Sequence, residues 1–152
     1  MAARYVSFSL STGRYCVPVD LVVQIVRLES LIEIPKPPPY VEGVINIRGD
    51  IIPVVNLRTR LEIAVDGPVP DARKRRVVVT RMGARLYGLD VDEVREIVEI
   101  PADGITRDAT SLLGANADFL LGIARREQGI YMVLDLPRVL GVSRDVPGAG
   151  QG

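Results

Sequence analysis

Short stretches in which apolar and polar residues alternate run along most of the chain, and valine and isoleucine fill many of the apolar positions. This pattern is typical of half-buried β-strands, and Gly, Pro, Asn and Asp residues separate the stretches. Ten short strands favour an all-β barrel or sandwich. We predict them at residues 5–10, 14–19, 23–28, 43–47, 50–56, 76–82, 85–91, 96–100, 120–126 and 130–135.

Tight turns and short helices are expected between these strands. The turns at 11–13 and 48–50 each contain a glycine where a hairpin needs positive φ. Asp20 and Asp92 are each predicted to cap the start of a short helical turn, because aspartate accepts hydrogen bonds from the first free backbone N–H groups. Helical content is otherwise minor, with further short helices expected at 57–61 and 136–140.

Three segments lack the strand pattern. Prolines occupy four of the five positions of 35–39, so this segment lacks backbone donors and is predicted to be an extended connector. Residues 64–75 contain glycine, proline and aspartate turn signals and are predicted to form a surface loop. Residues 143–152 have little to bury, and we predict a disordered tail.

The central loop separates two halves of the chain that resemble each other. Residues 15–26 align without gaps on 87–98 and share a tyrosine, a Val-Asp step and an Ile-Val ending. Residues 40–61 align on 119–140, where an aromatic residue opens each segment and a glycine follows three residues later. Because the matches occur in the same order in both halves, the sequence indicates an internal duplication.

Each half contains about five predicted strands, which is the number that closes a small barrel. We therefore predict two small β-barrels packed as one unit, and duplicates of this kind often exchange strands. The domain is expected over 1–142, with repeat halves at about 5–61 and 76–140.

Composition narrows the possible functions. The 152 residues carry 19 basic and 19 acidic side chains, and zero net charge argues against a dedicated nucleic-acid binder. The chain has no histidine, which excludes histidine triads, histidine zinc sites and phosphohistidine chemistry. Cys16 is the single cysteine and has apolar neighbours, so we interpret it as a buried structural thiol in a reducing compartment. No segment is apolar enough for export or for spanning a membrane.

The sequence offers few groups for catalysis. Asp90, Asp92 and Glu93 cluster at a strand end, as paired carboxylates or a divalent-metal site would. Since Asp92 aligns with Asp20, we interpret the cluster as a helix cap plus one surface acid at Asp90. The basic run 73–76 is interpreted as a solvated loop face rather than a phosphate or lipid-headgroup patch. We predict no enzyme activity, cofactor or metal, and expect the protein to act through strand edges and the groove between the barrels.

Residues 43–58 read GVINIRGDIIPVVNLR and resemble the signature segment of the CheW family of bacterial chemotaxis adaptors, G-x-x-N-L-R-G-x-x-x-P-x-x-D-L-R. Ile47 and Asn56 are conservative departures from it. The opening stretch from Phe8 is also similar to the family's, with Cys16 and Gln24 in place of the usual glycine and glutamate. The resemblance covers nearly the whole chain and implies two intertwined five-stranded SH3-like β-barrels with a few short helices.

The resemblance implies a non-catalytic adaptor that couples chemoreceptors, the methyl-accepting chemotaxis proteins, to the CheA histidine kinase. The implied partners are the cytoplasmic tip of the receptors, the regulatory domain of the kinase, and other CheW-like domains in rings. Nucleic acid and direct membrane insertion are not expected. The implied location is the cytoplasm, at the inner face of the membrane through receptor arrays.

Family receptor contacts match Arg48, together with Asn46 of the same Asn-Ile-Arg-Gly turn, and Val77; family kinase contacts match Val22 and Gln24. The Arg48 guanidinium can bind a carboxylate or backbone carbonyls, but it fits a role in bracing the turn as well. Val22 and Val77 fit an interface and a core equally. The alternative function is a small β-barrel that binds a small ligand or single-stranded nucleic acid, which zero net charge and few aromatic residues disfavour.

Overall fold

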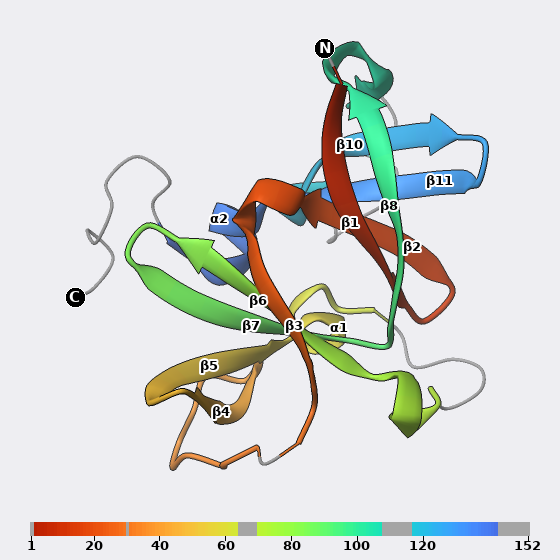
Figure 1. The fold of residues 1–152 in the computed structure, drawn as a ribbon. Coiled ribbons are helices and arrows are strands. Elements are labelled where there is room, and N and C mark those ends of the chain that lie inside the picture. Colours follow the sequence, from red (N-terminus) through yellow and green to blue (C-terminus); the bar gives the residue numbers. More distant parts are fainter. Residues whose placement is uncertain (1, 30, 64–69, 108–116, 143–152) are drawn as a thin grey trace.

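The computed structural model describes residues 2–29, 31–63, 70–107 and 117–142. Strands dominate it, and the predicted all-β fold with a few short helices is confirmed (Figure 1). The strands are β1 (Ala2–Leu10), β2 (Gly13–Pro18), β3 (Val22–Arg27), β4 (Val41–Ile47), β5 (Asp50–Asn56), β6 (Arg76–Met82), β7 (Arg85–Val91), β8 (Glu93–Pro101), β9 (Ile105–Thr106), β10 (Leu120–Arg126) and β11 (Gly129–Leu134). The helices are α1 (Leu57–Arg60) and α2 (Leu136–Leu140), with 3-10 turns η1 (Val19–Leu21), η2 (Ala72–Lys74) and η3 (Ala102–Gly104).

The strands form two sheets, and each sheet takes strands from both halves of the chain. Sheet A has six strands in the order β8-β1-β2-β11-β10-β9, and sheet B has five in the order β3-β6-β7-β5-β4. The first half thus gives β1 and β2 to a sheet completed by the second half, and the second half gives β6 and β7 to a sheet completed by the first. The predicted intertwining is confirmed.

Strand register follows the repeat alignment. Val54 pairs with Gly88 in sheet B, where β5 and β7 run parallel. The aligned residues Val133 and Cys16 pair in sheet A, where β11 and β2 run parallel. The two sheets are therefore built from equivalent strand pairs.

Glycines occupy bulges in two matching strands, β4 and β10. A Cβ atom on Gly43 would clash with the carbonyl oxygen of Ile32, which forms a bridge with Val44. A Cβ atom on Gly122 would lie 2.8 Å from the carbonyl oxygen of Thr106 in β9. Because a neighbouring backbone passes so close in both places, only glycine fits. The two-residue strand β9 is the sixth strand of sheet A, and the sequence pattern did not predict it.

Apolar side chains gather in three clusters. One lies inside sheet A, with residues from β1, β2, β8, β10 and β11, and one lies inside sheet B, with residues from β4, β5 and β6 and side chains of β3 and β7 packed against them. A cluster enclosed by the strands of one sheet is the interior of a small barrel. The third and largest cluster lies between the sheets and includes side chains of α1 and α2.

Strands that face two clusters are buried on both sides. Val77 and Val79 belong to the cluster inside sheet B, whereas Val78 belongs to the cluster between the sheets. This explains an unbroken valine run in place of alternation. Cys16 is fully buried inside sheet A, and burial raises the pKa of its thiol to about 12. The interpretation of Cys16 as a buried thiol of the core is confirmed.

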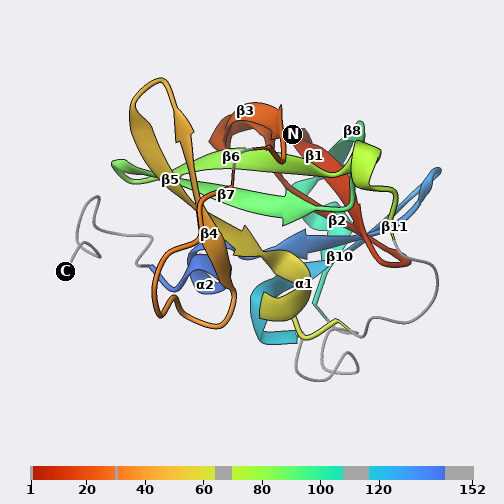
Figure 2. The same cartoon turned by 90° about the horizontal axis from the view of Figure 1, so that it is seen from below.

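The predicted helices at 57–61 and 136–140 are confirmed as α1 and α2, which lie side by side in Figure 2. The Asn56 side chain accepts a hydrogen bond from the Thr59 N–H at 3.2 Å, and the aligned Asp135 accepts one from the Arg138 N–H at 3.4 Å. Both helices therefore start with the same side-chain cap, as the repeat alignment requires.

Two other capping predictions were wrong. Asp20 lies inside η1, and the residue that precedes this turn is Pro18. Asp92 caps no helix, because β8 begins at the next residue, Glu93. An aspartate before an apolar stretch also suits a bend between two strands, and the sequence pattern does not separate the two cases.

The hairpin turns use positive φ, but not always at glycine. Arg48 and Gly49 both adopt it, at φ 53° and 89°, as a two-residue hairpin turn of type I′ requires. In the β1–β2 turn Ser11 adopts it, at φ 57°, and the prediction that Gly13 would do so was wrong.

Residues 35–39 connect β3 to β4 as predicted, but they are not fully extended. Lys36 has φ 50°, and the Val41 N–H donates to the Pro38 carbonyl at 3.0 Å, which closes a turn. Of the predicted loop 64–75, residues 70–75 are described and contain the exposed turn η2. The predicted disordered tail, 143–152, lies outside the described residues.

Candidate protein-interaction surface

Strand β3 carries two of the predicted contact residues at an edge of sheet B. It pairs with β6 on one side, and no strand of either sheet pairs with its other side among the described residues. Gln24 is exposed and Val22 is half-buried against the central cluster. Val23 and Ile25 are exposed at 47% and 41%. Three consecutive exposed residues arise because a bulge shifts the register between Val22 and Gln24, which the sequence pattern did not reveal.

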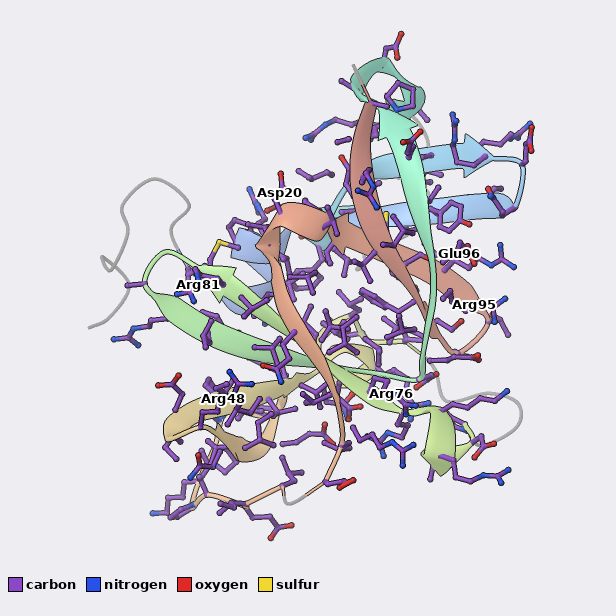
Figure 3. The ribbon with its side chains drawn as sticks, viewed as in Figure 1. Asp20, Arg48, Arg76, Arg81, Arg95 and Glu96 are labelled. Carbon is purple, nitrogen blue, oxygen red and sulfur yellow. The ribbon has the colours of Figure 1, made fainter. Side chains whose placement is uncertain are left out.

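The β4–β5 hairpin carries the other exposed candidates. The Asn46 side chain accepts a hydrogen bond from the Gly49 N–H at 3.0 Å, so Asn46 braces the turn. Arg48 is exposed and forms no hydrogen bond or ion pair with any residue in the described ranges. Figure 3 shows the Arg48 side chain at this end of the molecule. The guanidinium is thus held out by a turn that does not depend on it, which favours the contact interpretation over the bracing one.

Strand β3 and the β4–β5 hairpin are brought together by the closure of sheet B. The two edge strands β3 and β4 lie at opposite ends of the strand order. Val26 of β3 and Ile47 of β4 nevertheless pack against the same cluster inside the sheet. We call the exposed surface of Val22, Val23, Gln24, Ile25, Asn46 and Arg48 the first face.

Val77 is not part of the first face. Its side chain, the first of the valine run on β6, is fully buried in the cluster inside sheet B. Of the two interpretations of Val77, the structure supports the core. A partner cannot reach this side chain without opening the barrel, so the expected contact at Val77 is corrected.

The second half carries a matching surface. A groove of about 660 Å³ runs between β8 and the β10–β11 hairpin. Ile97, exposed at 51%, aligns with Ile25, and Glu127 aligns with Arg48. We call the groove residues Ile97, Val98, Glu99, Arg125, Arg126, Glu127 and Gln128 the second face. The two faces lie on matching strands of the repeat, and the charge differs where Glu127 takes the place of Arg48.

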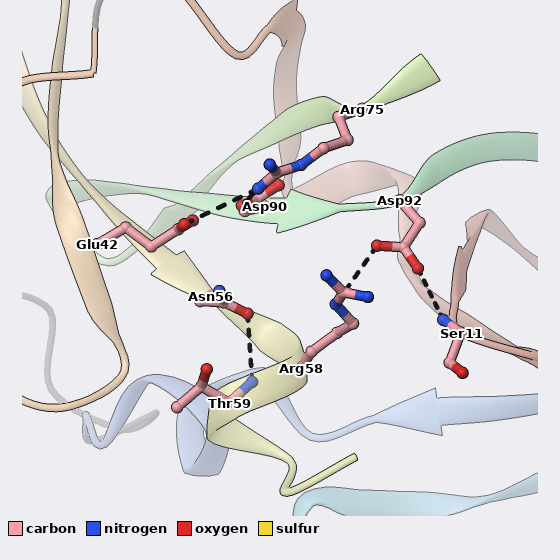
Figure 4. A network of polar contacts seen from close by, with 8 residues as sticks. All are labelled: Ser11, Glu42, Asn56, Arg58, Thr59, Arg75, Asp90 and Asp92. Atoms are coloured by element: carbon pink, nitrogen blue, oxygen red, sulfur yellow. Dashed lines mark hydrogen bonds and ion pairs between the residues drawn. The ribbon is translucent and has the colours of Figure 1, made fainter. Parts of the chain in front are cut away.

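The suspected carboxylate cluster is built into the framework. Asp92 accepts a hydrogen bond from the Ser11 N–H at 2.7 Å and lies 3.6 Å from the Nε of Arg58, so it ties the β1–β2 turn to α1 (Figure 4). Asp90 is buried rather than at the surface, which corrects the prediction, and it forms an ion pair with Arg75. Arg75 is half-buried, so the basic run 73–76 is not wholly solvated.

Glu42 completes this network. Its carboxylate lies 3.8 Å from the guanidinium of Arg75, beside Asp90, and both acids pair with the same nitrogen of Arg75 (Figure 4). Burial, and then the neighbouring Asp90 carboxylate, raise the pKa of Glu42 from 4.5 to about 8. Within the described ranges, no group of three or more cysteine or acidic side chains is placed to bind a metal ion. Glu42 and Asp90 pair with one arginine, Arg75, and the raised pKa of Glu42 keeps a proton on this pair of acids. The network therefore holds structural elements together.

The family model described as a CheW-like domain matches residues 4–144, nearly the whole chain. The chain belongs to the CheW-like domain family. The signature segment of the CheW resemblance, residues 43–58, forms β4, the Arg48 turn, β5 and the start of α1.

Individual CheW proteins agree with this assignment. The chemotaxis protein CheW of Treponema pallidum is 24% identical over 135 residues, which cover 88% of this chain and 79% of that protein. The CheW of Rhizobium meliloti is 30% identical over 134 residues, which cover 88% and 84%. The crystal structure of the scaffolding protein TtCheW from Thermoanaerobacter tengcongensis superposes with a TM-score of 0.81 at 28% identity, covering 95% of this chain and 92% of that one.

None of the helices in the described ranges is both long enough and apolar enough to cross a bilayer.

Proposed function

We propose that this chain is a non-catalytic adaptor that couples chemoreceptors to the CheA histidine kinase in a bacterial chemosensory array. The observation that carries the proposal is the CheW-like match over residues 4–144, whose signature turn presents to solvent an Arg48 side chain that forms no hydrogen bond or ion pair with the described residues. The names of the related proteins, chemotaxis protein CheW and scaffolding protein TtCheW, support a chemotaxis scaffold role. The array would hold the protein at the inner face of the membrane through its receptors.

The first face is the proposed contact for the kinase regulatory domain and the receptor tip. Val23 and Ile25 offer apolar area, and the edge of β3 that pairs with no other described strand offers backbone hydrogen bonds. Gln24 has no charge to pair, so its contribution is a hydrogen bond. Arg48 supplies the charged contact, because a guanidinium fork fits a carboxylate or a pair of backbone carbonyls.

Other CheW-like domains are the proposed partners of the second face. Glu127 and Glu99 stand where the first half has Arg48 and Arg27, so the charges at matching positions are reversed. This reversal favours contact between Arg48 of one domain and Glu127 of its neighbour, that is, between unlike faces. Such heterologous contacts close into rings when the rotation permits.

A catalytic role has no support in the polar network. The Asp90 and Asp92 carboxylates are already engaged with Arg75, Arg58 and the Ser11 N–H. Replacing both by asparagine keeps hydrogen-bonding shape and removes the charges. We expect the doubly substituted protein, where it remains folded by circular dichroism, to retain partner binding.

Pull-down with a purified kinase regulatory domain and a receptor cytoplasmic fragment tests the proposal. We expect the wild-type chain to bind both and Arg48→Glu to lose binding to one or both by about tenfold or more, the effect of removing a charge-assisted contact. Arg4→Glu is the control, because Arg4 is an exposed arginine on β1 of sheet A. Failure of the folded wild type to bind either partner would contradict the adaptor role, and an unfolded Arg48→Glu variant would show that Arg48 is structural.

A further inference from the structure

Strands β5 and β7 separate at one end of sheet B and leave a cleft. Their parallel pairing begins only at Val54 and Gly88. Ahead of it, residues 50–53 and 85–87 line a cleft of about 470 Å³, which Arg81 of β6 and Ala84 of the β6–β7 turn complete. We call it the β5–β7 cleft. Its volume falls in the range of about 300–1,000 Å³ that is usual for ligand pockets.

The internal repeat shows that this opening depends on particular residues. In sheet A the aligned residues Met132 and Tyr15 pair directly, so the ladder extends one position further. The residue that matches Met132 is Pro53, which has no backbone N–H to donate to a neighbouring strand. The Met132 side chain also reaches within 3.0 Å of the place where a Cβ atom on Gly13 would lie. In sheet B, position 53 therefore has a shorter side chain and no backbone N–H, and the β5–β7 pairing is one residue pair shorter at this end than the matching pairing in sheet A.

The cleft presents positive charge beside apolar surface. The Arg81 side chain is exposed and forms no hydrogen bond or ion pair with any residue that the structure describes. Arg85 lies on the neighbouring strand, β7. Asp50 is the acid of the lining. Among the residues that the structure describes, Ile51 is the most exposed of the large apolar side chains, at 58%. Figure 3 shows Arg81 near the free end of the β6–β7 hairpin.

Backbone groups in the cleft favour an extended occupant. Ile52 pairs with β4 and Leu86 pairs with β6, and in the described residues neither has a strand partner on the side that faces the cleft. An extended segment can form backbone hydrogen bonds along such strand edges. Every second side chain of the segment then contacts the residues that line the cleft.

We propose that the β5–β7 cleft binds a short extended segment of a partner protein in which acidic side chains flank an apolar one. The carboxylates bind Arg81 and Arg85, and the apolar side chain packs on Ile51. This site lies beside the first face and does not depend on which protein the first face binds. It therefore goes beyond the proposed adaptor function.

Nuclear magnetic resonance of the ¹⁵N-labelled full chain tests the proposal, with the peptide acetyl-Glu-Leu-Glu-Leu-Glu-amide as probe. We expect saturable shifts centred on the amides of Ile51, Arg81 and Tyr87, which weaken with salt. Arg81→Glu is expected to lower the affinity about tenfold or more, and Arg4→Glu to leave it unchanged. Pro53→Met, which introduces the residue found at the matching position in sheet A, is expected to lower it without changing net charge.

Four results would overturn the proposal. They are the absence of saturable shifts, equal binding of the peptide with lysine in place of glutamate, equal binding of glutarate alone, and shifts that appear with protein concentration in the absence of peptide. The third would indicate a small-anion site and the fourth contact between two copies. If Arg81→Glu does not fold, the Pro53→Met titration and the lysine peptide still decide the question.

Discussion

Arg60 is held between two aromatic rings that occupy matching positions of the repeat. Its Cζ lies 4.2 Å from the ring centre of Tyr40 and 4.8 Å from that of Phe119. Its Nε donates a hydrogen bond to the Val139 carbonyl at 2.7 Å. One side chain of α1 thereby binds the start of both duplicated segments and the end of α2.

Removing the Arg60 side chain tests how much it contributes to the free energy of unfolding. We expect Arg60→Ala to lower the free energy of unfolding by about 2 kcal/mol, from two cation–π contacts and the lost hydrogen bonds. Arg60→Lys keeps the charge but not the planar fork, and is expected to lower it by about 1 kcal/mol. Urea unfolding followed by circular dichroism measures both. Thr59→Ala, on an exposed position of the same helix, is the control, and equal midpoints for Arg60→Ala and wild type would contradict the assignment.

Glu42 makes the stability of the fold depend on pH. Its pKa of about 8 lies above the ordinary 4.5, so the folded state holds this proton more tightly than the unfolded state does. A raised folded pKa contributes stability that is fully present at low pH and is lost as pH rises from about 4.5 to about 8. Above that window two carboxylates share one Arg75, and the Glu42 Oε1 is a buried atom without a hydrogen-bond partner in the described chain.

Substituting glutamine for Glu42 isolates this effect. We expect Glu42→Gln to be more stable than wild type at pH 9 and to lose less stability than wild type between pH 6 and pH 9. Midpoints of urea unfolding at the two pH values measure the difference. The exposed Glu33→Gln is the control and is expected to follow wild type. Parallel pH dependences of Glu42→Gln and wild type would show that the Glu42 proton does not contribute.

At the scale of elements, alternation and turn residues predicted the ten longer strands and both α-helices. Most of these strands bury at least one face, so their own residues carry the signal, whereas β3 has only half-buried and exposed residues. The duplication predicted two similar barrels, and the intertwined arrangement was expected because duplicates often exchange strands and because the CheW resemblance implies it. The pairing and register of the strands come from the structure.

Other elements depend on contacts that no local pattern records. Strand β9 is two residues long and exists because Gly122 lets it approach β10. Val77 could be assigned to core or surface only once the strands on both sides of β6 were known. The β5–β7 cleft likewise arises because the pairing of β5 with β7 begins only at Val54, and the sequence analysis did not predict it.

Glycine at the matching bulges gives a test at this scale. We expect Gly43→Ala and Gly122→Ala each to lower the free energy of unfolding by about 2–3 kcal/mol, because the added methyl group meets the carbonyl oxygen of a neighbouring segment. Thermal unfolding by circular dichroism measures the loss, and Ala102→Ser at an exposed position is the control. Unchanged melting temperatures would show that the neighbouring segment is not held this close.

At the scale of the molecule, neither half of the chain contains a complete sheet. Sheet A needs β1 and β2 from the first half, and sheet B needs β6 and β7 from the second. The cluster between the sheets also draws on both halves. The two barrels are therefore one cooperative unit.

Separating the halves within residues 64–69 tests this interdependence. We expect residues 1–63 and 70–152, prepared apart, to give the collapsed amide spectra of unfolded chains, because each lacks the strands that close its barrels. Mixing the two is expected to restore the dispersed spectrum of the intact protein. A folded spectrum from either half alone would contradict the intertwined arrangement.

The central claim is that the chain links receptor to kinase, and reconstitution tests it most directly. The measurement is the phosphorylation rate of the CheA kinase in the presence of receptor-containing membranes, with and without this protein. We predict that the rate responds to the receptors only when the protein is present, and that Arg48→Glu weakens this response while Arg4→Glu does not. A kinase rate that is the same with and without the folded protein would contradict the account.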